Sequence, residues 1–511
     1  MSRTERLAVY TVVFLSGALL MSLEVAAFRI IGKTFGSALR ETTAVIAVFL
    51  AAMSIGYWAG GRAGDRYPRP STLIAVLLGT ALLLMGVPWL DAAVSPRIAA
   101  SNLDLATHAF VATSVLFGLP TILFASVSPI AIRLFTTSTG TSGSTAGSIS
   151  AVSTVGSIAG SVLTAFLLID WLGSIARTVI TVALAACITA LILLSAMLTR
   201  VRRESAHNVR LRGYAIALAA VLAVGVPAIA FIRSTQLEQS LLAPDPAWKV
   251  LFVGDSPYHR VTVRERVNFV RTLHFAFGTQ SQMLVKDPYG AGLPYSDAVH
   301  LAKMMRPTVK RVLLIGLGGG TVAKQFTRYY PDTTVDAVEI DPVVVDVAKK
   351  YFGVEPTDRL RIHTGDGRTF LTRTQEKWDL IVIDVATTNR YGDTIPPHLV
   401  TREFFAEAER HLSEGGVLHY HCAFQRSKLL LALQKTIASV FDSTYVTSGE
   451  ILASNAALLT PKETVLERAR TSPAGRLPDF ANYLAALKPY QPVPSDVPLL
   501  TDDYAPVDTL R

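Results

Sequence analysis

The chain has 511 residues, which is too long for one ordinary domain, and half of them are hydrophobic. Its formal net charge of +9 lies in the first half, because residues 1–235 carry 17 Lys and Arg against 8 Asp and Glu, whereas the remainder carries 31 of each. The second half therefore lacks the basic excess of a nucleic-acid-binding domain, and we expect no nucleic-acid partner. Cys187 and Cys422 are too few for a disulfide framework or a zinc site, and no metal is predicted.

The first half contains seven apolar segments long enough to cross a bilayer, which takes roughly 20 residues each. They lie at about 8–31, 42–60, 72–90, 109–132, 148–169, 175–198 and 214–232. We therefore predict a transmembrane helical domain over 1–235, with basic loops against the anionic lipid of the cell (inner) membrane.

The orientation of this domain is not settled by its charges. The basic loops 61–69 and 200–212 would both be cytoplasmic by the positive-inside rule, and seven spans would then send the second half outside. The chemistry described below favours a cytoplasmic second half instead.

The fifth segment is rich in Gly and Ser, and Gly156 and Gly160 stand four residues apart. Small residues at this spacing let two helices approach closely. We expect them to serve packing within the chain, and a homodimer face is the alternative.

After residue 235 the pattern changes to short strands and amphipathic helices. Residues 236–305 are predicted to form a small β-rich subdomain, because 258–264 alternates in polarity and 269–277 follows it. From 306 to 511 strands alternate with helices, which predicts a Rossmann-like α/β domain with a mostly parallel sheet. The predicted strands are 311–316, 334–340, 360–364, 378–384, 415–422, 443–448 and 454–459.

A glycine-rich turn follows the first of these parallel strands. It permits a tight bend and close approach of the backbone to a ligand, ahead of a helix N-terminus. The glycines are Gly316, Gly318, Gly319 and Gly320. Glu339 and Asp341 end the next strand, where an acidic residue binds ribose in dinucleotide-binding folds.

Two further acidic residues end the following strands. Asp366, followed by Gly367, is placed to accept a hydrogen bond from an adenine amino group, and Asp384 would face the reacting atoms. Ligands of such sheets bind beyond the carboxyl ends of the strands. These residues favour an S-adenosylmethionine-type site over a plain dinucleotide site, which is the natural competitor.

Residues from about 250 to 460 resemble the spermidine synthase family of aminopropyltransferases. The shared stretches are Ser256–Tyr258, Gln280–Ser281, Tyr295–Asp297, the glycine turn, Val338–Asp341, Gly365–Arg368, Ile383–Asp384 and Glu403–Phe405. The remainder is similar to the bacterial membrane-fused spermidine synthase-like proteins. That likeness is carried by Glu24–Val25, Arg29, Phe35–Gly36, Gly60–Arg66 and Leu500–Pro506.

This resemblance implies transfer of an aminopropyl group from decarboxylated S-adenosylmethionine, or a related sulfonium, to a small amine, with release of methylthioadenosine. Asp384 would be catalytic and Gln280 would help to bind the donor. The amine side would be formed by Tyr258, Tyr295, Asp297 and Asp393.

The sequence also departs from the family's pattern. Its glycine turn lacks the usual aspartate, and Thr387 stands where a second aspartate is common. Intact S-adenosylmethionine therefore remains open as the donor. The alternative functions are a methyltransferase acting on a membrane-associated substrate and a transporter whose second half senses a ligand.

Two smaller features also have two interpretations. His419 and His421 stand two residues apart on a predicted strand. They are either a metal-binding pair or buried or pocket-lining side chains. Tyr504, with Asp502 and Asp503, either folds back onto the site or belongs to a solvated tail.

Overall fold

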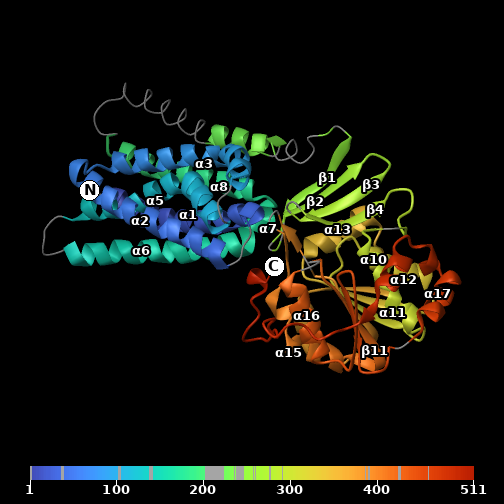
Figure 1. Cartoon of the computed structure of the whole chain (residues 1–511). Coiled ribbons are helices and arrows are strands. Elements are labelled where there is room, and N and C mark those ends of the chain that lie inside the picture. The colour runs from blue at the N-terminus through green and yellow to red at the C-terminus, as the bar shows by residue number, and fades with distance from the viewer. Residues whose placement is uncertain are drawn as a thin grey trace. The chain divides into compact units, whose positions relative to one another are not determined.

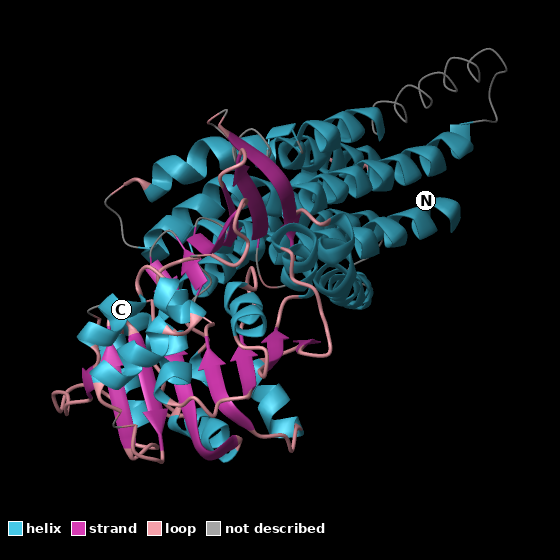
Figure 2. Cartoon of the chain, turned by 90° about the vertical axis from the view of Figure 1, so that its right-hand side faces the viewer, coloured by secondary structure: helices cyan, strands magenta, loops and turns pink. Residues whose placement is uncertain are grey.

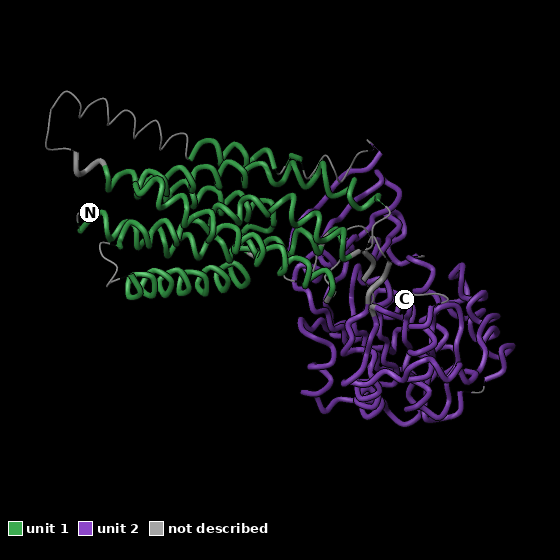
Figure 3. The backbone as a smooth tube through the Cα atoms, turned by 60° about the vertical axis from the view of Figure 1, so that its left-hand side comes forward, with its two compact units in different colours: residues 1–242 green, residues 243–511 purple. Residues whose placement is uncertain are grey.

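The computed structural model describes residues 3–35, 39–101, 105–136, 142–201, 224–234, 236–237, 245, 247–256, 258, 260–275, 278–290, 292–385, 387–389, 392–423, 427–458 and 460–510. The chain divides into two compact units, residues 1–242 and 243–511 (Figure 3). Each unit has its own core and is described by itself.

The first unit is a bundle of long apolar helices (Figure 1). Its elements are α1 (Arg3–Phe35), α2 (Leu39–Arg66), α3 (Pro70–Ala99), α4 (Leu105–Thr113), a π-helical turn (Ser114–Gly118), α5 (Leu119–Phe135), α6 (Ser142–Leu163), a second π-helical turn (Thr164–Leu168), α7 (Ile169–Leu172) and α8 (Ile175–Val201). The π-helical turns continue α4 into α5 and α6 into α7, so these pairs form unbroken helices.

Six described helical segments have the length and composition to cross a membrane. They are Arg3–Gly32, Arg40–Arg66, Pro70–Ala99, Ala106–Phe135, Ser142–Leu168 and Ile175–Met197. This is one fewer than the seven expected. Of the predicted segment 214–232, residues 214–223 lie outside the described part of the chain, and the described remainder belongs to a shorter apolar helix, Val224–Ser234.

The small residues of α6 pack against α1 of the same chain. A side-chain carbon at Gly156 would overlap the carbonyl oxygen of Phe14, and one at Gly160 would overlap that of Ala18. Ser157 also donates a hydrogen bond to the carbonyl oxygen of Gly17, at 3.3 Å. The two backbones therefore touch because the intervening side chains are missing, as expected for packing within the chain.

The second unit begins with a four-stranded antiparallel sheet. Its strands, in spatial order, are β1 (Trp248–Asp255), β2 (Arg260–Arg266), β3 (Val270–Phe275) and β4 (Gly278–Leu284). Val261 and Leu273 of this sheet share a buried cluster with Val344 and Phe352 of α13 (Pro342–Phe352). This apolar contact joins the small sheet to the large α/β domain.

The α/β domain is built on an eight-stranded sheet (Figure 2). In spatial order the strands are β14 (Lys488–Pro489), β12 (Ser443–Thr447), β13 (Glu450–Ser454), β11 (Leu412–His421), β8 (Trp378–Ile383), β5 (Arg311–Ile315), β6 (Thr334–Glu339) and β7 (Leu360–Thr364). The five strands from β11 to β7 are parallel, whereas β13, β12 and β14 pair antiparallel.

Helices cover both faces of this sheet, and two separate buried clusters mark the two faces. The helices are α10 (Tyr295–Ala298), α11 (His300–Met305), α12 (Thr321–Tyr329), α13, α14 (Gly367–Arg373), α15 (Arg402–Arg410), α16 (Lys428–Ala438), α17 (Lys462–Arg470) and α18 (Phe480–Ala486). The predicted Rossmann-like fold is confirmed, with a mixed sheet.

The prediction of a last strand at 454–459 was wrong. A two-residue turn at Ser448 and Gly449, where Gly449 has φ of +85°, starts β13 at Glu450 instead. Such a turn joins antiparallel neighbours, so Thr447 pairs directly with Glu450. The shift moves Glu450 from a predicted loop into the sheet.

Candidate active site

The strand register brings the main site residues to one edge of the large sheet. In the parallel strands Ile315 pairs with Val338 and Ile383, and Ile383 pairs with Tyr420. The residues that follow these pairs form a row across the edge of the sheet. The row consists of Glu450 of β13, His421 of β11, Asp384 after β8, Gly316 after β5 and Glu339 of β6. Asp366 follows the next strand, β7.

The glycine turn after β5 runs close to its neighbours. Gly316 has φ of +95°, and a side chain there would overlap the carbonyl oxygen of Asp384. Gly318 has φ of +52°, and Gly319 N–H donates to Ser281 Oγ at 2.8 Å. Gly320, with φ of +71°, precedes α12. The turn therefore needs glycine for its conformation as well as for space, which suits close approach of backbone to a ligand.

Glu339 holds this glycine turn through its carboxylate. Oε2 accepts hydrogen bonds from Leu317 N–H at 3.0 Å and Gly318 N–H at 3.2 Å, and Oε1 accepts from Asp341 N–H at 3.1 Å. Burial raises the pKa of Glu339 and outweighs these three backbone donors. A carboxylate has about four acceptor positions, so Glu339 can still receive a hydroxyl.

Asp341 is fully buried and caps a helix. Its side chain accepts from Val343 N–H at 2.9 Å at the start of α13, and it also accepts from the Ser256 hydroxyl. Ser256 Oγ in turn accepts from Tyr258 N–H at 3.1 Å. Asp341 thus ties the loop between β1 and β2 to the α/β domain, while the Tyr258 side chain remains 45% exposed.

Asp366 lies one strand further along the edge. Its Oδ1 caps α14 by accepting from Thr369 N–H at 2.8 Å, and its Oδ2 accepts from His398 Nε2 at 2.8 Å. Burial raises the pKa of Asp366, but these partners outweigh it, so the pKa is lowered overall. Gly367 has no space for a side chain because Ile315 of β5 packs against it.

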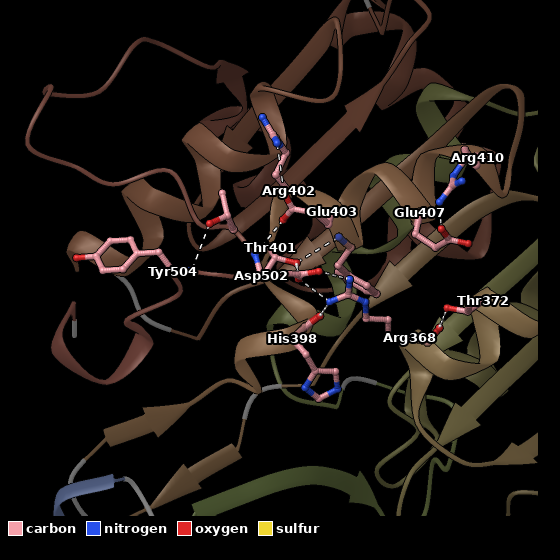
Figure 4. A network of polar contacts seen from close by, with 12 residues as sticks. Arg368, Thr372, His398, Thr401, Arg402, Glu403, Glu407, Arg410, Asp502 and Tyr504 are labelled. Carbon is pink, nitrogen blue, oxygen red and sulfur yellow. Dashed lines mark hydrogen bonds and ion pairs between the residues drawn. The ribbon is translucent and has the colours of Figure 1, made fainter.

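The carboxyl-terminal segment folds back near Arg368 and His398, and His398 is the partner of Asp366 (Figure 4). Arg368 makes two hydrogen bonds to Asp502, at 2.7 and 2.6 Å, and Thr401 Oγ1 donates to the same carboxylate at 2.7 Å. Arg368 also donates to the carbonyl oxygen of His398 at 3.2 Å. The Arg368 guanidinium lowers the pKa of Asp502 to about 2. Tyr504 beyond it is 58% exposed.

At the opposite end of the row, the site residues contact one another through their side chains. The hydroxyl of Tyr295 of α10 interacts with Asp384, and the Tyr295 ring stacks on that of His421 with centroids 3.9 Å apart. Burial, followed by the charge of Asp384, raises the pKa of Tyr295 well above its usual value. Burial also raises the pKa of Asp384, against the opposing effects of His421 and Tyr295.

A buried carboxylate that the sequence prediction missed lies next to these groups. Glu450 is fully buried, its Oε1 lies 2.7 Å from His421 Nδ1, and its Oε2 lies 3.1 Å from His419 Nε2. The turn at Ser448 and Gly449, between two strand-like runs, was the signal that could have placed it. Within the described part of the chain, no group of three or more His, Cys, Asp or Glu could hold a metal ion.

Three further predicted residues, Asp297, Gln280 and Asp393, lie outside this row. Asp297 shares α10 with Tyr295, is 1% exposed, and accepts from Asp479 N–H at 3.0 Å. Burial raises its pKa to about 6. Gln280 precedes the Ser281 that contacts the glycine turn, and its amide donates to Gly278 O at 3.5 Å. Asp393 lies in a short hairpin, and its side chain is outside the described residues.

Comparison with known proteins assigns a family to this arrangement. Residues 295–451 match the Spermine/spermidine synthase domain. A polyamine aminopropyltransferase of Vibrio vulnificus is 34% identical over 230 residues, which cover 43% of this chain and 75% of that protein. A probable polyamine aminopropyl transferase of Bifidobacterium longum is 33% identical over 197 residues, covering 38% of this chain and 42% of its own length.

One solved structure, of spermidine synthase in complex with the transition state analogue AdoDATO, is 21% identical and covers 43% of this chain and 77% of its own, with a TM-score of 0.35. The Vibrio vulnificus relative carries the assignment, because the match exceeds 30% identity and extends over three quarters of that protein. The chain belongs to the polyamine aminopropyltransferase family, whose members are transferases.

Proposed function

We propose that this protein transfers an aminopropyl group from decarboxylated S-adenosylmethionine to a small amine and releases methylthioadenosine. The observation that carries the proposal is the row at the sheet edge, where Asp384 stands between the glycine turn and a buried, side-chain-built cluster. Family membership supports the type of reaction, and the residues below are our assignments for this chain.

The donor is proposed to lie along the glycine turn. Glycines at Gly316 and Gly318 leave the backbone open to close approach, and the acceptor capacity that remains on Glu339 suits a ribose hydroxyl. Asp366, with its lowered pKa, suits an adenine amino group as an ionised acceptor. Asp341 supports this side indirectly, because it is buried and caps α13.

The sulfonium of the donor is already a good leaving group, so the protein mainly has to align the amine and keep it neutral. Asp384 is proposed to orient an N–H of the amine and to accept its proton. Tyr295 remains neutral because its pKa is raised, and its hydroxyl fixes the carboxylate of Asp384. The partly buried position of this pair strengthens both interactions.

The outer part of the amine site is assigned to three further residues. Asp297, on the same short helix as Tyr295, supplies a nearby carboxyl group, and Tyr258 an exposed aromatic ring. Asp393, in the segment that follows Asp384, is assigned to the same part of the site through its negative charge. Gln280 belongs to the donor side through its neighbour Ser281.

We further propose that the first unit anchors the enzyme in the cell (inner) membrane with the second unit in the cytoplasm, where the sulfonium donor is made. The support is the six described helices with the length and composition of membrane spans. Reporter fusions to the carboxyl terminus, active either in the cytoplasm or outside it, test the orientation.

Product analysis tests the reaction. The full-length protein, purified in detergent, is incubated with decarboxylated or intact S-adenosylmethionine and a panel of small amines, and the products are identified by mass spectrometry. Methylthioadenosine together with an aminopropylated amine supports the proposal. S-adenosylhomocysteine would instead identify a methyltransferase, and bound ligand without product would identify a sensing domain.

A further inference from the structure

His421 occupies a central position on the acceptor side of the sheet. It pairs with Glu450 of β13, and because Tyr420 pairs with Ile383 of β8, Asp384 is the next residue in the row of His421. Neighbouring strands lie about 4.8 Å apart, and residues in one row point to the same face. His421 is therefore flanked by a carboxylate on either side.

Glu450 contacts this imidazole directly, and Asp384 is its neighbour in the row on the other side. His421 Nδ1 lies 2.7 Å from Glu450 Oε1. Burial raises the pKa of Asp384, and His421 opposes this effect more than any other neighbour does. The ring of Tyr295, whose hydroxyl interacts with Asp384, stacks on the imidazole with centroids 3.9 Å apart.

Glu450 determines which nitrogen of His421 carries a proton. Burial raises the pKa of Glu450, but the charge and hydrogen bond of His421, together with the nearby His419, outweigh burial, so the pKa is lowered overall. An ionised carboxylate can only accept hydrogen bonds, so His421 donates from Nδ1. Nε2 is then the nitrogen that gains or loses a proton.

This assignment depends on the proposed function. We infer that Asp384, His421 and Glu450 form one proton-accepting unit in aminopropyl transfer, in which His421 acts through Asp384 as a relay and positioning residue. The lone pair of the amine forms the new C–N bond while the C–S bond breaks and its electron pair stays on sulfur. The resulting ammonium gives one proton to Asp384, and His421 takes that proton up as an imidazolium.

Two flanking carboxylates stabilise the imidazolium that this step forms, whereas Asp384 and Glu450 without it would be two like charges in one row. The imidazolium then releases this proton to solvent through its 12% exposed side chain, and the unit is ready for the next amine. The titratable groups around this unit are Tyr295 and Asp297 of α10, His419 and Tyr420 of β11, Cys422 after β11, and Tyr483 of α18.

The test is the dependence of kcat on pH at saturating donor and amine, where kcat reports groups in the enzyme–substrate complex. For the wild type we expect kcat to fall on the acid side, because an imidazolium cannot take up a second proton. In His421→Asn the amide can still donate to Glu450, but the relay is lost. We expect kcat to fall about 100-fold. The acid limb, which is the fall of kcat at low pH, should move to lower pH because Asp384 alone then accepts the proton.

Glu450→Gln is the second variant, because it keeps the shape of the side chain and removes its charge. Loss of the negative charge disfavours the imidazolium, so we expect the acid limb to move to lower pH with a smaller loss of kcat, about 10-fold. The binding constant for methylthioadenosine should stay within twofold of the wild type in both variants, because neither residue is assigned to the donor side.

His411→Asn is the matched control. His411 also contacts a glutamate, Glu407, at 3.3 Å, but it precedes β11 and so lies at the opposite end of the strand from His421. This variant should keep the wild-type pH profile.

A lower kcat with an acid limb at the wild-type pH in both His421→Asn and Glu450→Gln would show a purely structural role and overturn the inference. A wild type that forms no methylthioadenosine from any amine would overturn the proposed function itself.

Discussion

The two ends of the site are built in different ways. On the proposed donor side, backbone N–H groups bind Glu339 at the glycine turn and Asp366 at the start of α14, where His398 is a second partner of Asp366. On the acceptor side, Asp384 and Glu450 are held by the side chains of Tyr295 and His421. Backbone donors fix a carboxylate for recognition, whereas titratable side chains can also receive and pass on a proton.

The largest expected effect is that of Asp384→Asn. An amide cannot accept the proton of the amine, so we expect kcat to fall by about 10³-fold, within the range for loss of a general base. Binding of methylthioadenosine, measured by calorimetry, should change by less than twofold because the donor side is intact. Full activity in this variant would refute the assigned role.

Gly316→Ala should disturb both ends of the site at once, because Gly316 lies between them in the row. The new methyl group would overlap the Asp384 carbonyl oxygen, and φ of +95° disfavours any side chain. We expect kcat to fall and the donor KM to rise, each by about 10-fold or more. Gly353→Ala is the control, since it has φ of +68° but no atom near the added carbon.

If Gly353→Ala loses as much activity as Gly316→Ala, then backbone strain, rather than contact with Asp384, causes the loss of activity. Steady-state kinetics with each substrate varied in turn separates the two outcomes.

Glu339→Gln should affect the donor side alone. Hydrogen bonds to a charged group contribute about 1.5–3 kcal/mol, which corresponds to roughly a 10- to 100-fold rise in the donor KM. We expect kcat at saturating donor to change by only a few fold, because the acceptor-side groups are untouched. The exposed Glu355→Gln serves as control, and an equal loss of kcat would contradict the separation of the two sides.

The smallest expected effect is that of Asp502→Asn on the carboxyl-terminal segment. The folded pKa of Asp502, about 2, lies below the usual value of 3.8. Its stabilisation is therefore present above about pH 4 and is lost as the pH falls toward 2. Because the side chain is 43% exposed, we expect the change at pH 7 to be less than about 1 kcal/mol.

Limited proteolysis of the carboxyl terminus measures this effect. The wild type should be more resistant than Asp502→Asn at pH 7, and the difference should disappear near pH 2. A difference that persists there would show that the ion pair with Arg368 is not its cause.

The sequence located the glycine turn and the acidic residues at the strand ends because the signals for them are local. Apolar runs ending in glycine or acidic residues located the ends of β5, β6 and β8, and a parallel sheet brings such ends to one edge. The sequence did not show that Asp341, which caps α13, also accepts a hydrogen bond from Ser256, because Ser256 is 85 residues away in the chain. Apolar composition likewise indicated α1 to α8 but could not define the number of spans.

The acceptor side was decided by tertiary structure. Glu450 is an ordinary acidic residue in the sequence, and only the tight turn before β13 and the pairing of β13 with β11 bring it against His421. Asp502 meets Arg368, 134 residues away, only because the carboxyl-terminal segment folds back. Sequence patterns report the face and the end of each strand, whereas the order and register of the strands determine which distant charges share a buried site.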